Sequence, residues 1–282
     1  MKFYKKSHDV GVPFDSNGII KKAEAAIGIE PIHITDYPAP LSMGGIHDYY
    51  SNGDYWWPNP DTTDGLPYIH KDGESNPENF DAHRLALRKL RTNVANLAAA
   101  YHIAKNEKYA EKAITFLKEF FLDEETMMNP NLLYAQAIPG ICSGRGIGII
   151  DTLHLIDLPM AINALKGSRF LTSRIEAGLK EWFANYLDWM SSHPNGIAEM
   201  NAQNNHGVCW CVQASVFAAF TGNQKIINIC RERYKMVILP EQMVQDGSLP
   251  RELKRTKPYS YSIFTLDNLV TLCHVLSKVK IE

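Results

Sequence analysis

The chain has 282 residues, with 29 Lys and Arg against 31 Asp and Glu, so its formal net charge is −2. Hydrophobic residues make up 45% of the sequence and charged residues 21%, which is typical of globular proteins and excludes a disordered chain. A net charge this close to zero gives no global positive field and excludes a generally basic nucleic-acid-binding protein. No run of about 18 apolar residues is present, so we expect no membrane-spanning segment.

The N-terminal segment and the cysteines bear on the cellular compartment. The segment MKFYKKSHDVGVPFD contains basic residues but no apolar core, so it is not an intact signal peptide. We therefore expect a cytoplasmic protein, or a periplasmic or secreted one if a leader has been removed. The cysteines are odd in number and form no CxxC pair, so we expect buried free thiols rather than a disulfide framework.

Residues 30–81 are rich in Pro, Gly, Asp and Asn and show little helical or strand period. A structureless stretch of this length is uncommon in a compact domain and indicates either function or disorder. Its many aromatic side chains argue against disorder because they supply surface to bury. We therefore expect an ordered, loop-rich segment over a cleft. Tyr55, Trp56 and Trp57 are either core anchors or a platform on which sugar rings stack, and His47 is a polar residue in the same region.

From Ala82 onward, apolar residues recur every three or four positions, which predicts amphipathic helices. Thr172 and the turn Thr221–Asn223 carry the cap and turn residues that separate helices. No series of strands alternates with the helices, so we expect an all-α fold of antiparallel helix pairs around one core. Periodicity does not distinguish a bundle from a solenoid or a closed ring. The predicted helices cover residues 82–101, 109–121, 147–165, 173–192, 205–220, 224–239 and 263–279.

The segment Gly144–Asp151 contains a Gly-x-Gly-x-Gly pattern. It lacks the full spacing of a dinucleotide-binding loop and no strand precedes it, so a tight loop entering a helix is the better interpretation. Arg145 in this loop is either a ligand contact or a structural hydrogen-bonding fork. The sequence contains no HExxH or CxxC motif, and we expect no metal and no cofactor.

Asn204, Asn205 and His206 begin an apolar helix. Simple N-capping by an asparagine explains the pattern and is favoured on these residues alone. The alternative is a polar cluster at a helix N-terminus, where negative charge is favoured and His206 is able to act as a general base.

The main basic run, Arg251–Lys257, carries four cations and one anion in seven residues. It is either a solvated loop or an anion site in which an arginine fork binds a carboxylate. Tyr259 and Tyr261 follow directly, and we expect the adjacent positive charge to lower the pKa of a tyrosine there.

Taken together in their order along the chain, several blocks resemble the alginate lyase superfamily of polysaccharide lyases. They are HDYYSNGDYWWPNPDTTDGLPYIHKDGESNPE, MNPNLLYAQAIPGICSGRGIGIIDT, NNHGVCW and DGSLPRELKRTKPYSYSIFTLDNL. The first two are most similar to a branch that includes glucuronan-active lyases, and the last two to the active-site motifs of mannuronate-specific alginate lyases. The resemblance implies a single domain over residues 1–282 with an α/α toroid fold, a ring of helical hairpins. Family members usually continue with further helices, so we expect an incomplete ring and an incomplete closing wall of the cleft.

The resemblance also implies site residues. It places Asn205 and His206 at the reacting sugar, together with the arginine of the ELKR segment, Arg255. Tyr261 matches the catalytic tyrosine best, and Tyr259 is its rival. The family often has Ser-Tyr-Trp after the NNH motif, where this chain has Gly207–Trp210, which leaves the substrate preference open. The candidate substrate-binding residues are His47, Tyr55, Trp56, Trp57, Arg145, Asn204 and Tyr259.

The implied reaction is β-elimination from a uronate of an acidic polysaccharide such as alginate, polymannuronate or glucuronan. The C5 proton is acidic enough to remove only when the neighbouring carboxylate is neutralised, a role that suits Asn205 and Arg255. Tyr261 is the expected acid and a candidate base, and His206 is a base or a further neutralising group. Two rival functions remain open: a non-catalytic glycan-binding protein, and an α/α-toroid glycoside hydrolase, which would need two carboxylates.

Overall fold

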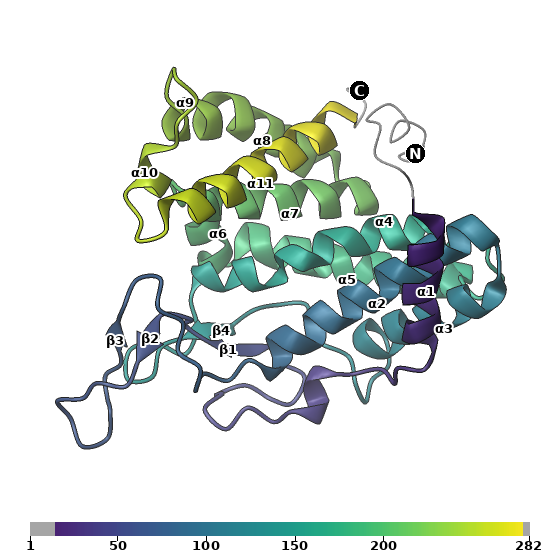
Figure 1. Ribbon diagram of the computed structural model, residues 1–282, viewed down its shortest axis with the longest axis horizontal. Coiled ribbons are helices and arrows are strands. Elements are labelled where there is room, and N and C mark those ends of the chain that lie inside the picture. The colour runs from purple at the N-terminus through teal and green to yellow at the C-terminus, as the bar shows by residue number, and fades with distance from the viewer. Residues whose placement is uncertain (1–14, 279–282) are drawn as a thin grey trace.

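The computed structural model describes residues 15–278, which form mainly helices, as predicted (Figure 1). The basic N-terminal stretch and Val279, the last residue of the predicted final helix, lie outside these residues. The α-helices are α1 (Ser16–Ile27), α2 (Ala82–Ala104), α3 (Glu107–Phe121), α4 (Asp157–Ala164), α5 (Ser173–Ser192), α6 (Pro194–Met200), α7 (Asn205–Thr221), α8 (Gln224–Arg233), α9 (Leu239–Gln242), α10 (Pro250–Leu253) and α11 (Pro258–Lys278).

Helix α7 is the centre of the core. It packs against α5, α8 and α11, and against the 3₁₀ helix η3 (Gly146–Ile156). Its sequence is apolar on every side, and a helix of that kind is stable only when it is buried all round. Buried hydrogen bonds tie it to its neighbours, because Thr152 of η3 contacts both Gln213 of α7 and Tyr186 of α5. The predicted helix is therefore correct in position, but its burial is not confined to one stripe.

Capping residues fix several of the helix boundaries. The side chain of Thr172 accepts a hydrogen bond from the backbone of Ile175 at the start of α5. Asn223 caps α8 in the same way through Ile226. Gly222 ends α7 with φ 80°, a left-handed conformation that favours glycine. The cap and turn signals in the sequence are confirmed at these positions.

The predicted helix over residues 147–165 is instead two elements. Residues Gly146–Ile156 form the tighter η3, and α4 begins at Asp157. The glycines of this segment allow close approach, because a Cβ atom at Gly148 would collide with Ala135, and one at Gly146 with the backbone of Asn195.

Two further boundaries differ from the prediction. The helix predicted over residues 224–239 ends as α8 at Arg233, and the π-helical turn η4 (Tyr234–Ile238) precedes α9. Helix α11 begins five residues earlier than predicted, at Pro258, because proline is compatible with the first helical turn. As a result, Tyr259 and Tyr261 lie in the first turns of a helix.

The loop-rich segment of residues 30–81 is ordered and contains short elements that the sequence did not indicate. They are η2 (Ile34–Asp36), β1 (Tyr50–Asn52), β2 (Trp56–Trp57) and β3 (Ile69–His70). Strand β1 pairs in parallel with β4 (Tyr134–Ala137), and β2 pairs with β3 in an antiparallel hairpin. These strands lie at the end of the molecule where α2, α10 and α11 begin (Figure 1).

Two expectations from composition are modified by the structure. The stretch Gly146–Ala164 is, by length and composition alone, apolar enough to cross a membrane, although we expected no such segment. It is weak support for a span, because half of its most apolar window is buried within the fold. The cysteines are free, as expected, but Cys273 is exposed and Cys142 is only partly buried.

Candidate active site

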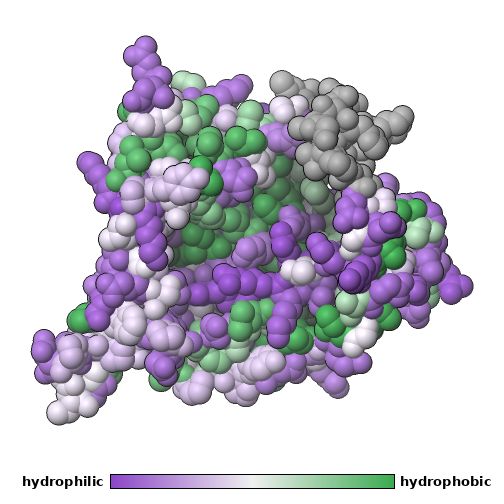
Figure 2. Space-filling model, in the orientation of Figure 1, coloured by the Kyte–Doolittle hydropathy of each residue, from purple (hydrophilic) through white to green (hydrophobic). Residues whose placement is uncertain are grey.

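A pocket of about 770 Å³ lies between the loop-rich segment, α2, η3 and the first turns of α7 and α11. Figure 2 shows this face of the molecule hollowed, with hydrophobic residues in the hollow and hydrophilic residues along its rim. The pocket brings together Asn205, His206, Arg255 and Tyr261, all predicted as catalytic. It is also lined by four of the predicted substrate-binding residues, namely Tyr55, Trp56, Arg145 and Asn204.

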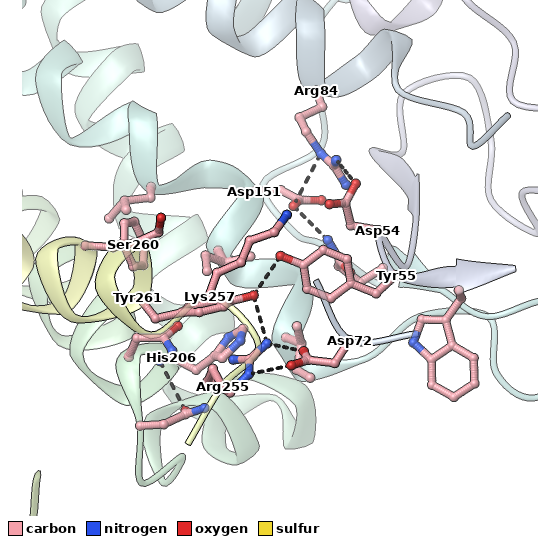
Figure 3. A pocket seen from close by; sticks show the side chains of 18 of the residues that line it. Asp54, Tyr55, Asp72, Arg84, Asp151, His206, Arg255, Lys257, Ser260 and Tyr261 are labelled. Atoms are coloured by element: carbon pink, nitrogen blue, oxygen red, sulfur yellow. Dashed lines mark hydrogen bonds and ion pairs between the residues drawn. The ribbon is translucent and has the colours of Figure 1, made fainter. Parts of the chain in front are cut away.

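Arg255 organises one side of the pocket (Figure 3). Its Nη2 atom donates to the hydroxyl of Tyr261 at 2.8 Å and to Oδ1 of Asp72 at 2.5 Å. The guanidinium also lies 3.9 Å from the centroid of the Tyr261 ring. Tyr261 is in turn hydrogen-bonded to the hydroxyl of Tyr55 at 2.7 Å. A single cation thus joins the loop after β3 to the first turns of α11.

The network determines the protonation of Asp72 and Tyr261. Hydrogen bonds from Arg255 and Thr256 lower the pKa of Asp72 to about 2. Burial raises the pKa of Tyr261 above its ordinary value, and the hydrogen bond with Tyr55 adds to this increase. We expected the adjacent cation to lower the pKa of this tyrosine, and that prediction is wrong. Arg255 does lower the pKa of Tyr261, but burial raises it by more. Tyr261 is a neutral phenol at physiological pH.

Two buried carboxylates hold the Asn-His pair at the start of α7. The backbone N–H and the side-chain amide of Asn205 both donate to Glu252 of α10, at 2.8 to 3.0 Å. The Nδ1 atom of His206 lies 2.6 Å from Oε1 of Glu199, which is 1% exposed. Because a carboxylate accepts, Nδ1 is the donor in this bond, and in the neutral imidazole Nε2 then keeps its lone pair. Asn204 caps α7, as the simpler interpretation held, by accepting from the backbone of His206.

A second ionic network forms the opposite side of the pocket. Arg84 of α2 lies 3.5 Å from Asp151 of η3 and donates to Asp54 at 3.3 Å (Figure 3). Asp151 also accepts from Ser51 at 2.5 Å and from Gln136 at 3.0 Å. These contacts tie α2 and η3 to the strands beneath the pocket.

Arg145 is a structural hydrogen-bonding fork, and it also lines the pocket. Its Nε atom donates to the backbone carbonyl of Gln136 at 2.9 Å, which is a structural bond. Its guanidinium also faces the pocket, 5.8 Å from the Trp56 ring centroid. Gly53 permits this arrangement, because a Cβ atom there would collide with Trp56.

The remaining predicted binding residues do not line the pocket. His47 is hydrogen-bonded to the carbonyl of Met127 at 2.8 Å. Trp57 donates its indole N–H to the carbonyl of Glu74 and lies under the amine of Lys71. Tyr259 is 78% exposed. The structure thus places Tyr261, and not Tyr259, in the hydrogen-bonding network.

Sequence reasoning missed the carboxylates that hold the site, Asp72, Asp151, Glu199 and Glu252, and the cation Arg84. Asp72, Asp151 and Glu252 fall within the blocks that carry the family resemblance, so those blocks were the available signal. Arg84 and Glu199 have no local motif. Their role depends on tertiary contacts between elements far apart in the sequence.

Comparisons with known proteins agree with this fold and site. The profile of the family described as alginate lyase matches residues 34–282. The crystal structure of an alginate lyase from Bacteroides ovatus superposes with a TM-score of 0.89 and 38% identity, over 93% of this chain and 70% of that one. Alginate lyase A1-III from Sphingomonas species A1 has a TM-score of 0.56 and 14% identity, over the same shares of the two chains. No curated protein matches significantly. The predicted α/α toroid is confirmed.

We predict that Asp72→Asn destabilises the protein in a pH-dependent way. The folded pKa of Asp72, about 2, lies below the ordinary 3.8, so its stabilising effect is complete above the ordinary value and is lost as the pH falls toward 2. We expect a loss of about 1 kcal/mol in the free energy of unfolding at neutral pH, because the partly exposed pair is screened by solvent.

Urea denaturation at a series of pH values measures this effect. The exposed Asp61→Asn, which removes the same charge from the same loop-rich segment, serves as the control. The difference between wild type and Asp72→Asn is expected to shrink between neutral pH and about pH 3. A difference that stays constant over this range would contradict the ionic origin.

Proposed function

Because this chain belongs to the alginate lyase family and is a polysaccharide lyase, we propose that its pocket binds a uronate segment of alginate or a related polymer and cleaves it by β-elimination. The observation that carries the proposal is the hydroxyl of Tyr261, held 2.8 Å from Arg255 in the pocket that Asn205 and His206 also line. The C4–O bond of the uronate would break and a C4=C5 double bond would form.

Charge in the pocket supports an anionic substrate. Its lining carries five Lys or Arg side chains and three Asp side chains, although the whole chain has a net charge of −2. Each of these aspartates contacts an arginine. Among residues 15–278, Arg88, Arg145 and Lys257 have no carboxylate within salt-bridge distance. These cations are the groups available to a polymer that carries a carboxylate on each sugar.

The first chemical requirement is to neutralise the uronate carboxylate, since only then is the C5 proton removable. Arg255 supplies a cation, and Asn205, whose amide nitrogen donates to Glu252, lines the same pocket. A fixed cationic donor such as Arg255 stabilises the enolate-like transition state without reorganisation during the reaction.

The second requirement is one base and one acid. Tyr261 keeps its proton because burial raises its pKa, so it is suited to protonate the leaving O4 oxygen. His206 presents Nε2 as the proton acceptor, since Glu199 holds Nδ1, and it is therefore suited to remove the C5 proton. We assign Tyr261 as the acid and His206 as the base.

A hydrolytic mechanism fits the pocket less well. A glycoside hydrolase needs two carboxyl groups that reach the glycosidic bond. Asp54, Asp72 and Asp151 all line the pocket but contact arginines, and Glu252 is bound to Asn205. A purely glycan-binding function would leave the buried Glu199–His206 pair without a role.

We predict that Tyr261→Phe abolishes the lyase activity. The assay is the ultraviolet absorbance of unsaturated uronate products from alginate, polymannuronate and glucuronan. Loss of the general acid should lower kcat by at least about 100-fold. Tyr259→Phe is the matched variant, because it removes the same hydroxyl two residues away and outside the pocket. If Tyr259→Phe lost activity and Tyr261→Phe kept it, the assignment would be overturned.

We predict that Glu199→Gln lowers kcat by about tenfold with little change in KM, because Glu199 orients His206 but does not contact substrate. Steady-state kinetics on the preferred polymer tests this. The control is Glu181→Gln, which removes an exposed carboxylate on α5. An unchanged kcat, or a change in KM alone, would show that Glu199 has no part in positioning the base.

A further inference from the structure

The pocket continues about one helical turn past Tyr261. Three side chains line this extension: Arg88 of α2, His154 of η3 and Phe264 of α11. Arg88 comes four residues after Arg84 on α2, and Phe264 comes three residues after Tyr261 on α11. Arg84 and Tyr261 also line the pocket. Helices α2 and α11 both begin at the end of the molecule where the strands lie (Figure 1). The extension therefore runs away from the strands, along the helix axes.

Arg88 differs from the neighbouring arginines on the same face of α2. Arg84 is paired with Asp54 and Asp151, and Arg91 is paired with Asp157 at 2.5 Å. Arg88 is exposed and has no carboxylate partner among the described residues. A guanidinium that faces a pocket without a protein partner is available for a bidentate bond to a ligand carboxylate.

The groups beside Arg88 suit a sugar ring. His154 is partly buried, and burial together with the charges of Arg88 and Arg91 lowers its pKa, so it is a neutral imidazole that does not compete with the cation. A neutral imidazole both donates and accepts, as a sugar hydroxyl requires. Phe264 and Leu153 also line the pocket and supply apolar surface that suits the apolar face of a pyranose.

We propose that Arg88, His154 and Phe264 form an accessory subsite that binds the carboxylate and ring of a second uronate residue next to the reacting one. One α-helical turn advances about 5.4 Å, a distance comparable to the length of one pyranose unit in a chain. The subsite rests on the proposed function, because it requires that a uronate polymer lies in the pocket. With this subsite, the enzyme selects a polymer that carries a carboxylate on each of two neighbouring sugars.

The test compares wild type, Arg88→Gln and Arg88→Lys on uronate oligosaccharides of increasing length. The matched control is Lys89→Gln, which removes a charge from the adjacent exposed position of α2, outside the pocket. Loss of a charged hydrogen bond should raise KM for oligosaccharides that reach the subsite by roughly tenfold in Arg88→Gln. The kcat value should change little, and Arg88→Lys should restore part of the affinity because it keeps the charge.

A binding measurement separates this inference from the proposed function. Calorimetry with Tyr261→Phe, which does not consume the ligand, compares a uronate oligosaccharide with its carboxyl-reduced counterpart. Adding Arg88→Gln to this variant should weaken binding of the charged oligosaccharide by roughly tenfold and leave binding of the reduced one unchanged.

If wild type cleaves uronates and Arg88→Gln has wild-type KM at every length, the accessory subsite is wrong and the proposed function stands. If wild type neither cleaves nor binds any uronate oligosaccharide, both are wrong. Equal weakening of charged and reduced oligosaccharides would also overturn the inference, because the effect would not depend on the carboxylate.

Discussion

The guanidinium of Arg255 is the contact on which the site depends. It bonds Asp72 of the loop-rich segment and Tyr261 of α11, two parts of the chain that are almost two hundred residues apart. The ion pair with Asp72 fixes the direction of the guanidinium, and the guanidinium in turn fixes the phenol. Without Asp72, a long and flexible arginine side chain would have to lose its rotamer freedom when the substrate binds. Preorganisation of this kind is what allows donors to favour the transition state over the ground state.

The same design recurs on the other groups of the site. Glu252 holds Asn205, Glu199 holds His206, and Asp151 holds Arg84. Arg255, Asn205, His206 and Arg84 are thus each held by a carboxylate. Part of the chain's negative charge is thus placed behind or beside these groups. The net positive character of the pocket is therefore compatible with a protein whose total charge is slightly negative.

The tyrosine shows why residue types alone do not determine chemistry. The neighbouring basic run indicates a lowered pKa for Tyr261, whereas burial and Tyr55 raise it. Desolvation acts on the charged form and increases with depth, and the sequence does not specify the depth of Tyr261. The raised pKa changes the chemical role, since a phenol that keeps its proton is an acid. In the proposed mechanism the base is therefore a different residue, His206.

Much of the fold was predictable because its helices have clear apolar periods and caps, as at Thr172 and Asn223. The exceptions have local physical causes. Gly146 and Gly148 allow a 3₁₀ segment to approach neighbouring backbone, and α1 lies before the region in which a period was recognised. In the site, Asn205, His206, Arg255 and Tyr261 were predictable from motifs, because they lie in short blocks with a recognisable order. Glu199 and Arg84 were not, since a contact between distant helices leaves no pattern in the sequence near either residue.

The central claim is that the protein breaks the glycosidic C4–O bond by elimination rather than by adding water. Mass spectrometry of the products formed in heavy-oxygen water tests this most directly. The account predicts one fragment that is lighter than a hydrolysis product by one water, carries a C4=C5 double bond and contains no heavy oxygen. Products that contain heavy oxygen and lack the double bond would contradict it.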